Sequence, residues 1–401
     1  MDSEYYYYYD NYSTISDEYL ADIMDTVRQK VHPGPFEWMI ISSYIIVFLF
    51  SIIGNSLVCI TVLQNEQMRT VTNMYIVNLS IADILVTVLC VPWTVTYEVT
   101  HTWFFGATAC SIISYIQLVC VGVSIFTLTF IALDRYLAIC CPFKYKINRS
   151  RTVVLIAIAW MLAIIIALPV YFVHEIEEDS LKRYHEKVWL TTCGEKWSNE
   201  TLRKLYHIGL VLELYIVPLF IITLAYTKVC RTLWSGIPTE EKTSGKMPDK
   251  KIRTSSTSAA QTQTENRKKV ARMLIVVVVL FALCYFMTHV MNLLKLFGVF
   301  DDFNLFDDSD IQLMLLLNTV THWFMYFNSA VNPIIYNFLS AKFREEFKAL
   351  CLCCCRRSQK KRQDMLSDPG RTTEYMGMSC KKSSALESRR THNSYTAVQT
   401  V

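Results

Sequence analysis

Long apolar stretches recur along roughly the first 340 positions of the chain and then stop. Each stretch holds about 20 residues or more, enough to cross the hydrocarbon core of a bilayer as a helix. The pattern therefore predicts an all-α membrane protein, a seven-transmembrane helix bundle. The expected spans, numbered 1 to 7 in chain order, are 39–63, 72–97, 108–139, 151–173, 206–230, 270–298 and 312–338.

The segments outside the helical spans have other patterns. In the N-terminal segment, 1–38, apolar residues recur at helical spacing from Asp17 to Val31. This spacing predicts a short amphipathic helix that lies on the membrane surface or contacts a ligand. Within the predicted bundle, 39–339, the Ser-, Thr- and Lys-rich segment 235–266 indicates a flexible cytoplasmic loop. After the bundle we expect an amphipathic helix 8 over 340–351 and a disordered cytoplasmic tail over 352–401.

Composition and charge support a multi-pass membrane protein. Hydrophobic residues make up 52% of the chain and charged residues only 18%. Basic residues gather between spans 3 and 4 and before span 6, whereas acidic residues gather on the opposite side, so the rule of positive inner loops predicts an extracellular N-terminus at the plasma membrane. The acidic outer face would either attract a cationic ligand or simply reflect this orientation. The basic residues are Lys144, Lys146, Arg149, Arg151, Arg267, Lys268, Lys269 and Arg272.

Cysteine positions agree with that orientation. Of the 14 cysteines, only Cys110 and Cys193 lie on the predicted outer side, where an oxidising compartment would pair them. Two sequons, at Asn11 and Asn199, also face outward and are expected to carry glycans. A cluster of cysteines lies at the end of the amphipathic helix 8, a position that favours palmitoylation. A zinc site is less favoured, because no second pair of ligands is present. The cluster consists of Cys351, Cys353, Cys354 and Cys355.

Several polar residues interrupt the apolar spans at mid-membrane depth. Asp83 is the most costly of them, because an ionised carboxylate in a bilayer needs a partner. Together with Ser124, Asn328 and Asn332 it offers hard oxygen ligands that suit a sodium ion. A hydrogen-bonded polar core without an ion explains the same residues equally well.

An ordered set of motifs along the seven spans resembles rhodopsin-like G-protein-coupled receptors. The motifs are GN in span 1, NLSIAD in span 2, Cys110 and DRY in span 3, Trp160 in span 4, Pro218 and Tyr226 in span 5, and NPIIY in span 7. The resemblance implies that Asp83, Ser124, Asn328 and Asn332 line a sodium pocket, and that Arg135 pairs with Asp134 at rest and then swings toward the G protein. It also implies arrestin and receptor kinases as partners of the tail. The activation residues it implies are Asp134, Arg135, Tyr226, Tyr285, Asn332, Pro333 and Tyr336.

Other functions fit these residues less well. A retinal protein needs a lysine in span 7, and none lies between Phe306 and Ala341. An amine receptor of the same family would carry an aspartate where this chain has Gln117. A transporter would show two repeated halves in its sequence, and no internal repeat is visible. An intramembrane enzyme would carry a motif such as HExxH or GxSxG, and neither motif occurs. We therefore expect no enzyme activity, no required cofactor beyond an allosteric sodium ion, and no nucleic-acid partner, only membrane lipid around the bundle.

A closer resemblance covers residues 17–355. The runs HTWFFG, YHIGL and NSAVNPIIYNFLSAKFREEFKA, with Tyr285 in place of the usual tryptophan, resemble the orexin receptors and their invertebrate allatotropin-receptor relatives. The resemblance implies an extracellular amidated neuropeptide as ligand, and a heterotrimeric G protein that acts through phospholipase C and calcium. The alternatives are an RFamide or neuropeptide Y type of receptor and, from another class, a transporter. The pocket residues it implies are Thr94, Glu98, Gln117, Glu195, His207, Tyr215, Asn292, Lys295, His322 and Tyr326.

Some positions depart from that family. Gly194 and Leu210 stand where orexin receptors have an acidic and an aromatic residue, so the pocket is not identical. Met287 replaces the proline that usually kinks span 6, which predicts a straighter helix. Glu213 is a further intramembrane carboxylate for which the sequence offers no partner.

Overall fold

The computed structural model describes residues 33–142, 148–178, 191–234, 250–299, 308–350 and 352. Helices dominate these residues. In chain order the elements are α3 (Pro35–Gln64), the 3-10 turn η1 (Glu66–Met68), α4 (Val71–Leu89), α5 (Val91–Thr100), α6 (Gly106–Cys140), α7 (Arg149–Val173), β1 (His174–Glu178), β2 (Thr191–Glu195), α8 (Glu200–Val211), the π-helix η3 (Leu212–Ile216), α9 (Val217–Trp234), α10 (Lys250–Leu296) and α11 (Asp308–Leu339).

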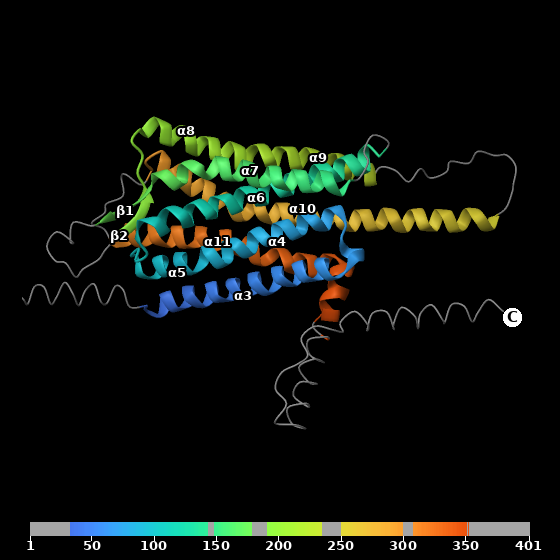
Figure 1. Ribbon diagram of the computed structural model, residues 1–401, viewed down its shortest axis with the longest axis horizontal. Coiled ribbons are helices and arrows are strands. Elements are labelled where there is room, and N and C mark those ends of the chain that lie inside the picture. The colour runs from blue at the N-terminus through green and yellow to red at the C-terminus, as the bar shows by residue number, and fades with distance from the viewer. Residues whose placement is uncertain are drawn as a thin grey trace, which may run out of the picture. The chain divides into compact units, whose positions relative to one another are not determined.

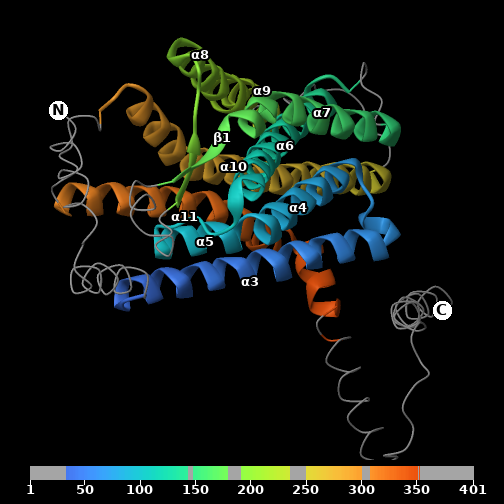
Figure 2. The ribbon, with the colours of Figure 1, turned by 60° about the vertical axis from the view of Figure 1, so that its left-hand side comes forward.

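The helices of the unit that ends at Ser340 lie side by side as a bundle (Figure 1). α3 packs against α4 and α11, α6 packs against α4, α7 and α9, and α10 packs against α11 (Figure 2). Six helical stretches among the described residues are long and apolar enough to cross a membrane. α11 completes a seven-helix bundle, and each predicted span coincides with a helix or with a pair of consecutive helices.

Prolines shape several of these helices, because proline has no N–H to donate and its ring crowds the preceding turn. α4 and α5 are separate helices that meet at Cys90, two residues before Pro92. In the span formed by α8, η3 and α9, the π-helix η3 ends at Ile216, and Pro218 is the second residue of α9. α7 and α11 continue through Pro169 and Pro333. In contrast, α10 passes through Met287 without a break, as the loss of the usual proline predicts.

The structure differs from the prediction at the start of α10. We expected a flexible loop over 235–266, but α10 begins at Lys250. No glycine or proline occurs between 250 and 266, so the apolar helix can extend outward by adding one hydrogen bond per residue. The helix over 341–350 agrees with the amphipathic helix 8 expected there. The amphipathic helix expected over Asp17–Val31 lies outside the described residues.

Candidate functional site

The centre of the bundle holds the intramembrane polar residues that the sequence singled out. Asp83 is 2% exposed, and Asn332 donates its amide N–H to Asp83 Oδ2 at 3.0 Å. Ser124 and Asn328 are buried too, although no hydrogen bond between either of them and Asp83 is found. These four residues supply carboxylate, hydroxyl and amide oxygens, the donor types that fit sodium. Sodium binding stays a prediction.

A second polar group ties neighbouring helices together close to Asp83. Asn55 Nδ2 donates to the backbone carbonyls of Ser51 and Ser329, both at 2.9 Å. Asn78 donates to Thr127 Oγ1 and accepts a hydrogen bond from Trp160 Nε1. Asn78 is buried between helices, so the sequon that begins there is not accessible for glycosylation.

The half of the bundle away from the β1–β2 hairpin holds the expected activation residues. Arg135 donates to Asp134 at 2.5 Å and pairs with it as an ion pair. The hydroxyl of Tyr226 is buried and has no hydrogen-bond partner among the described residues. It is therefore available to Arg135 if the guanidinium leaves Asp134. Tyr285 and Tyr336 are buried as well, and the ring of Tyr285 lies 4.4 Å from that of Phe281.

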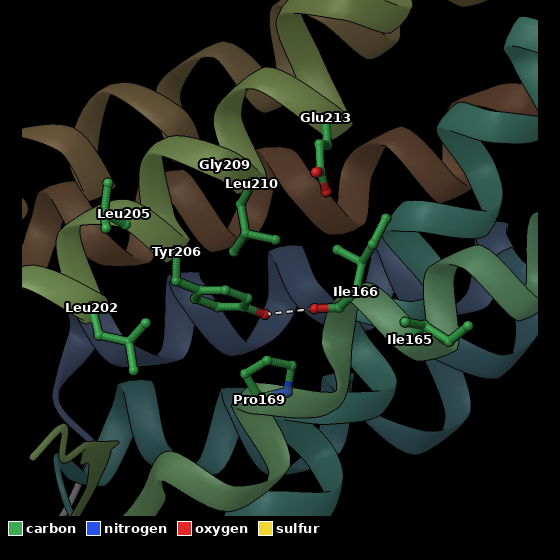
Figure 3. A pocket seen from close by; sticks show the side chains of 9 residues that line it. All are labelled: Ile165, Ile166, Pro169, Leu202, Leu205, Tyr206, Gly209, Leu210 and Glu213. Carbon is green, nitrogen blue, oxygen red and sulfur yellow. Dashed lines mark hydrogen bonds between the residues drawn. The ribbon is translucent and has the colours of Figure 1, made fainter.

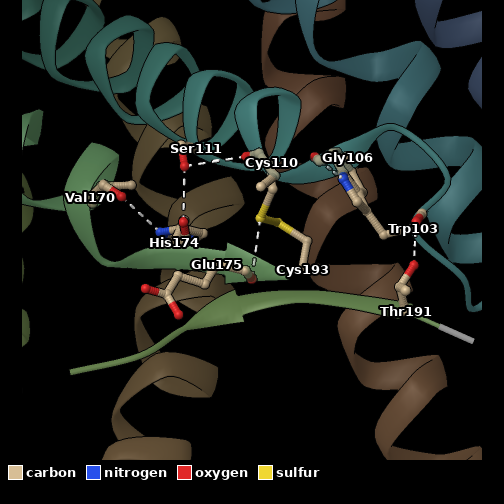
Figure 4. The surroundings of a disulfide bond; sticks show 10 residues. Trp103, Gly106, Cys110, Ser111, Val170, His174, Glu175, Thr191 and Cys193 are labelled. Atoms are coloured by element: carbon tan, nitrogen blue, oxygen red, sulfur yellow. Dashed lines mark hydrogen bonds between the residues drawn. A yellow bond between two sulfur atoms is a disulfide. The ribbon is translucent and has the colours of Figure 1, made fainter. Parts of the chain in front are cut away.

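The predicted disulfide joins Cys110 of α6 to Cys193 of β2, with the two Cα atoms 5.7 Å apart. It holds the β1–β2 hairpin over the outer end of α6 (Figure 4). Ser111 donates to the carbonyl of His174 at 2.9 Å, and Thr191 donates to the carbonyl of Trp103. The hairpin is therefore fixed at both strands and positions Glu195 at the mouth of the bundle.

A buried carboxylate joins α5 to α11. Glu98 of α5 is only 6% exposed and accepts hydrogen bonds from Thr319 Oγ1 and His322 Nδ1, the latter at 2.5 Å. Both partners lie on α11, three residues apart, and therefore face the same side of that helix. Sequence reasoning proposed Glu98 and His322 separately, and Thr319 was missed, although its spacing from His322 was the available signal.

A second chain of hydrogen bonds crosses the bundle one turn further along α11. The hydroxyl of Tyr326 interacts with Thr94 Oγ1 at 2.7 Å and donates to Gln117 Oε1 at 3.0 Å. The amide N–H of Gln117 points to the sulfur of Met325 at 3.4 Å. Tyr44, which the sequence did not single out, packs edge-on against Tyr326 with ring centroids 6.1 Å apart. Thr94, Gln117 and Tyr326 thus come together as the resemblance implied.

Glu195 of β2 and His207 of α8 contact one another beside the hairpin. His207 Nε2 lies 2.7 Å from Glu195 Oε2, and Trp197 Nε1 donates to the same oxygen at 2.8 Å. Burial raises the pKa of Glu195, but the hydrogen bonds and charges of His207 and its neighbours lower it more, so the pKa lies below its ordinary value. Burial also holds the pKa of nearby His174 below its ordinary value, despite the opposing effect of Glu195.

The remaining predicted pocket residues are spread over α10 and η3. Tyr215 donates to the carbonyl of Ala282 at 2.9 Å, and its ring lies 4.6 Å from that of His289, another residue that the sequence did not indicate. Lys295 donates to Asn318 Oδ1 at 2.7 Å. Asn292 is exposed, and no side-chain hydrogen bond connects it with the other pocket residues.

The predicted modification sites are tested only in part. Asn199 is the N-cap of α8, where its side-chain oxygen accepts the backbone N–H groups of Thr201 and Leu202. That contact uses the oxygen and leaves the amide nitrogen for a glycan, so glycosylation stays a prediction. Asn11 and the cysteines at 351, 353, 354 and 355 lie outside the described residues.

Comparison with known proteins agrees with this arrangement. Residues 54–336 match the model of the 7 transmembrane receptor (rhodopsin family). The chain is 32% identical to neuropeptide FF receptor 1 of Rattus norvegicus over 79% of this chain and 71% of that receptor. It is 30% identical to the QRFP-like peptide receptor of Branchiostoma floridae over 77% of this chain and 76% of that receptor.

A bundle of apolar helices long enough to span a membrane, with buried polar residues at its centre, agrees with a membrane receptor. The chain belongs to the rhodopsin family of seven-transmembrane receptors, the class A G-protein-coupled receptors. Members of this family are receptors and not enzymes, as the sequence predicted.

Proposed function

We propose that the chain is a plasma-membrane receptor for an amidated peptide and activates a heterotrimeric G protein. The observation that carries this proposal is the polar lining of the outer pocket, where Glu98, His322 and Gln117 lie within one hydrogen-bonded region. A carboxamide such as Gln117 can both donate to and accept from a terminal amide, which a simple carboxylate cannot. The names of the two relatives, both peptide receptors, agree with a peptide ligand.

A peptide ending in arginine-phenylalanine amide, an RFamide, fits the pocket best. Glu98 and Glu195 offer carboxylates that a guanidinium can bind through paired hydrogen bonds. The names of the relatives favour this type over the orexin or allatotropin type that the sequence motifs resemble. A receptor of the orexin or allatotropin type is the second candidate. It is supported by four residues that stand where the resemblance to those receptors places pocket residues: Gln117, His207, Tyr215 and His322.

The peptide would act by favouring a second arrangement of the helices. An agonist can shift the equilibrium only if it binds the active arrangement more tightly than the resting one. In the resting arrangement Arg135 is held by Asp134. On activation Arg135 would leave this carboxylate for Tyr226 and the G protein, which then signals through phospholipase C and calcium.

The first experiment measures intracellular calcium in cells that express the chain, with untransfected cells as the control. The panel contains RFamide, orexin-like and allatotropin-like amidated peptides and their free-acid forms. A response to an RFamide that is lost in its free-acid form supports the proposal. A response restricted to orexin-like or allatotropin-like peptides keeps the peptide receptor and replaces the ligand type. A surface-expressed receptor that transports an ion-coupled solute and answers no peptide contradicts it.

The second experiment tests which carboxylate receives the arginine. The active peptide is compared with an analogue in which neutral citrulline replaces arginine, on the wild type and on Glu98→Gln and Glu195→Gln. A charge-assisted hydrogen bond contributes about 1.5–3 kcal/mol, so the matching pair should show a tenfold or larger loss of potency that is not additive. Glu177→Gln, on the exposed side of β1, is the matched control. Additive losses at both carboxylates would refute a direct contact.

A further inference from the structure

A pocket on the lateral surface of the bundle is lined by none of the residues proposed to bind the peptide. It lies between α7 and the α8–η3 segment and has a volume of about 400 Å³ (Figure 3). Apolar side chains form most of its wall, among them Ile165, Leu202 and Leu205, which are exposed at the surface that faces lipid. Its size suits a small organic molecule, because ligand pockets commonly have volumes of about 300–1,000 Å³.

One end of this pocket is charged. Glu213 lies in η3, about 20 Å along the helix axis from Glu200, the first residue of α8. Its carboxylate is directed toward the pocket (Figure 3). No hydrogen bond or ion pair joins Glu213 to any residue that the structure describes. An intramembrane carboxylate without a partner is costly, which favours a cationic partner from outside the chain.

Elsewhere in the pocket, the hydroxyl of Tyr206 already has a hydrogen-bond partner, and the space beside Gly209 is empty. The hydroxyl of Tyr206 donates to the carbonyl of Ile166 at 2.8 Å and is therefore not free to bind Glu213. Pro169 has no N–H, so the carbonyl of Ile165 lacks the donor that it would have in an uninterrupted helix. Gly209 contributes no side chain, and a Cβ added there would meet no atom within 4 Å. The floor at Gly209 is therefore open space that an apolar tail can fill.

We propose that this pocket binds an amphiphile with a protonated amine head and an apolar tail, which enters from the lipid bilayer. The ammonium group would pair with Glu213, and the tail would lie along Leu202, Leu205 and Gly209. The charge of Glu213 argues for a cation, and the depth of this carboxylate argues for a molecule that partitions into the membrane. This inference does not depend on the peptide ligand proposed above.

The occupant would touch an element that connects three helices. Leu214, the next residue after Glu213, is buried and would lie 3.8 Å from a Cβ at Gly122 of α6. Tyr215 binds the carbonyl of Ala282 on α10. Because η3 is a π-helix, a form that is often found at functional sites, a ligand at Glu213 is placed to affect the contact of this span with α10.

The test uses the full-length receptor in phosphatidylcholine nanodiscs. The probe is a decyl dimethylamine with a diazirine in its tail, and its neutral counterpart is the decanol with the same diazirine. We expect saturable labelling of peptides from residues 165–169 and 202–213 by the amine, at least tenfold above the alcohol at equal membrane concentration. Unlabelled amine should compete.

Three variants decide the outcome. Glu213→Gln should lower the labelling about tenfold or more, as the loss of a charge-assisted contact predicts. Gly209→Leu should block the pocket by filling it, and the open space at Gly209 allows that side chain. Glu200→Gln, the same change on an exposed residue of the same helix, should label as the wild type. Thermal unfolding confirms that each variant is folded.

Two results would overturn the proposal. Equal labelling by the amine and the alcohol, or unchanged labelling of a folded Glu213→Gln variant, would show that the carboxylate does not select the ligand. Absence of labelling together with crosslinks between two receptor copies at the same peptides would show that a second copy of the chain covers this face.

Discussion

The close approach of α3 and α11 at Gly54 leads to a stability prediction that the structure makes quantitative. A Cβ added to Gly54 would lie 2.7 Å from Cβ and 2.8 Å from Cγ of Pro333. Carbon atoms in contact are normally about 3.5–4.0 Å apart, so either the helices or the proline ring must move. Overpacking of this kind costs about 1–3 kcal/mol, against a gain of about 1 kcal/mol for replacing a helical glycine with alanine. We expect Gly54→Ala to be destabilised by up to about 2 kcal/mol.

The assay is thermal unfolding of the purified receptor in nanodiscs, followed by tryptophan fluorescence. Gly209→Ala is the matched control, because its new Cβ meets no atom within 4 Å and only the helix propensity changes. Gly54→Ala should therefore melt several degrees below the wild type and Gly209→Ala at or above it. If Gly54→Ala melts with or above the wild type, the contact between Gly54 and Pro333 is not tight, and the reasoning fails.

Three further predictions concern the polar centre, the disulfide and the outer hairpin. Asp83→Asn should abolish any dependence of agonist binding on sodium that the wild type shows, whereas an undiminished sodium effect in this variant would place the ion elsewhere. Cys193→Ser should release β2 from Cys110 and lower agonist affinity at least tenfold in a binding assay on cells with matched surface expression; unchanged affinity would show that the hairpin does not shape the pocket. Since the pKa of His174 is lowered by the fold, the unfolded chain binds the proton more readily, and stability should fall as the pH drops below about 6.5. His174→Gln should flatten the thermal stability between about pH 7 and pH 5.5, and an unaltered slope would assign the effect to another group.

The sequence was informative about the helices because burial in a membrane leaves a strong periodic signal. It predicted seven spans, the disulfide between Cys110 and Cys193, and the group of buried polar residues around Asp83. The prediction was wrong at the start of α10, where no hydrophobic pattern marks the helix. Nothing in the Ser- and Thr-rich composition before residue 267 indicated that α10 begins at Lys250, because a helix that continues from an apolar span needs no amphipathic pattern of its own.

Side-chain partners were harder to predict than helices. The sequence proposed Glu98 and His322 through a resemblance, but it could not show that they contact one another, since the contact depends on how α5 meets α11. The break at Cys90, two residues before Pro92, is part of what sets that geometry. The sequence also could not show that Glu213 faces a pocket and not the interior of the bundle, because Glu213 lies within the π-helix η3, where the directions of the side chains differ from those of a regular α-helix.

α11 connects these contacts at two depths of the bundle. Its outer part binds Glu98 through Thr319 and His322, and its middle binds Asp83 through Asn332. The next residue, Pro333, lies against the backbone of Gly54. His322 and Asn332 are about 15 Å apart along one continuous helix. A peptide that draws His322 away from Glu98 would therefore act on the same rigid element that holds Asp83. These polar contacts also explain why α11 is absent from the six helices that are apolar enough by composition alone to span a membrane.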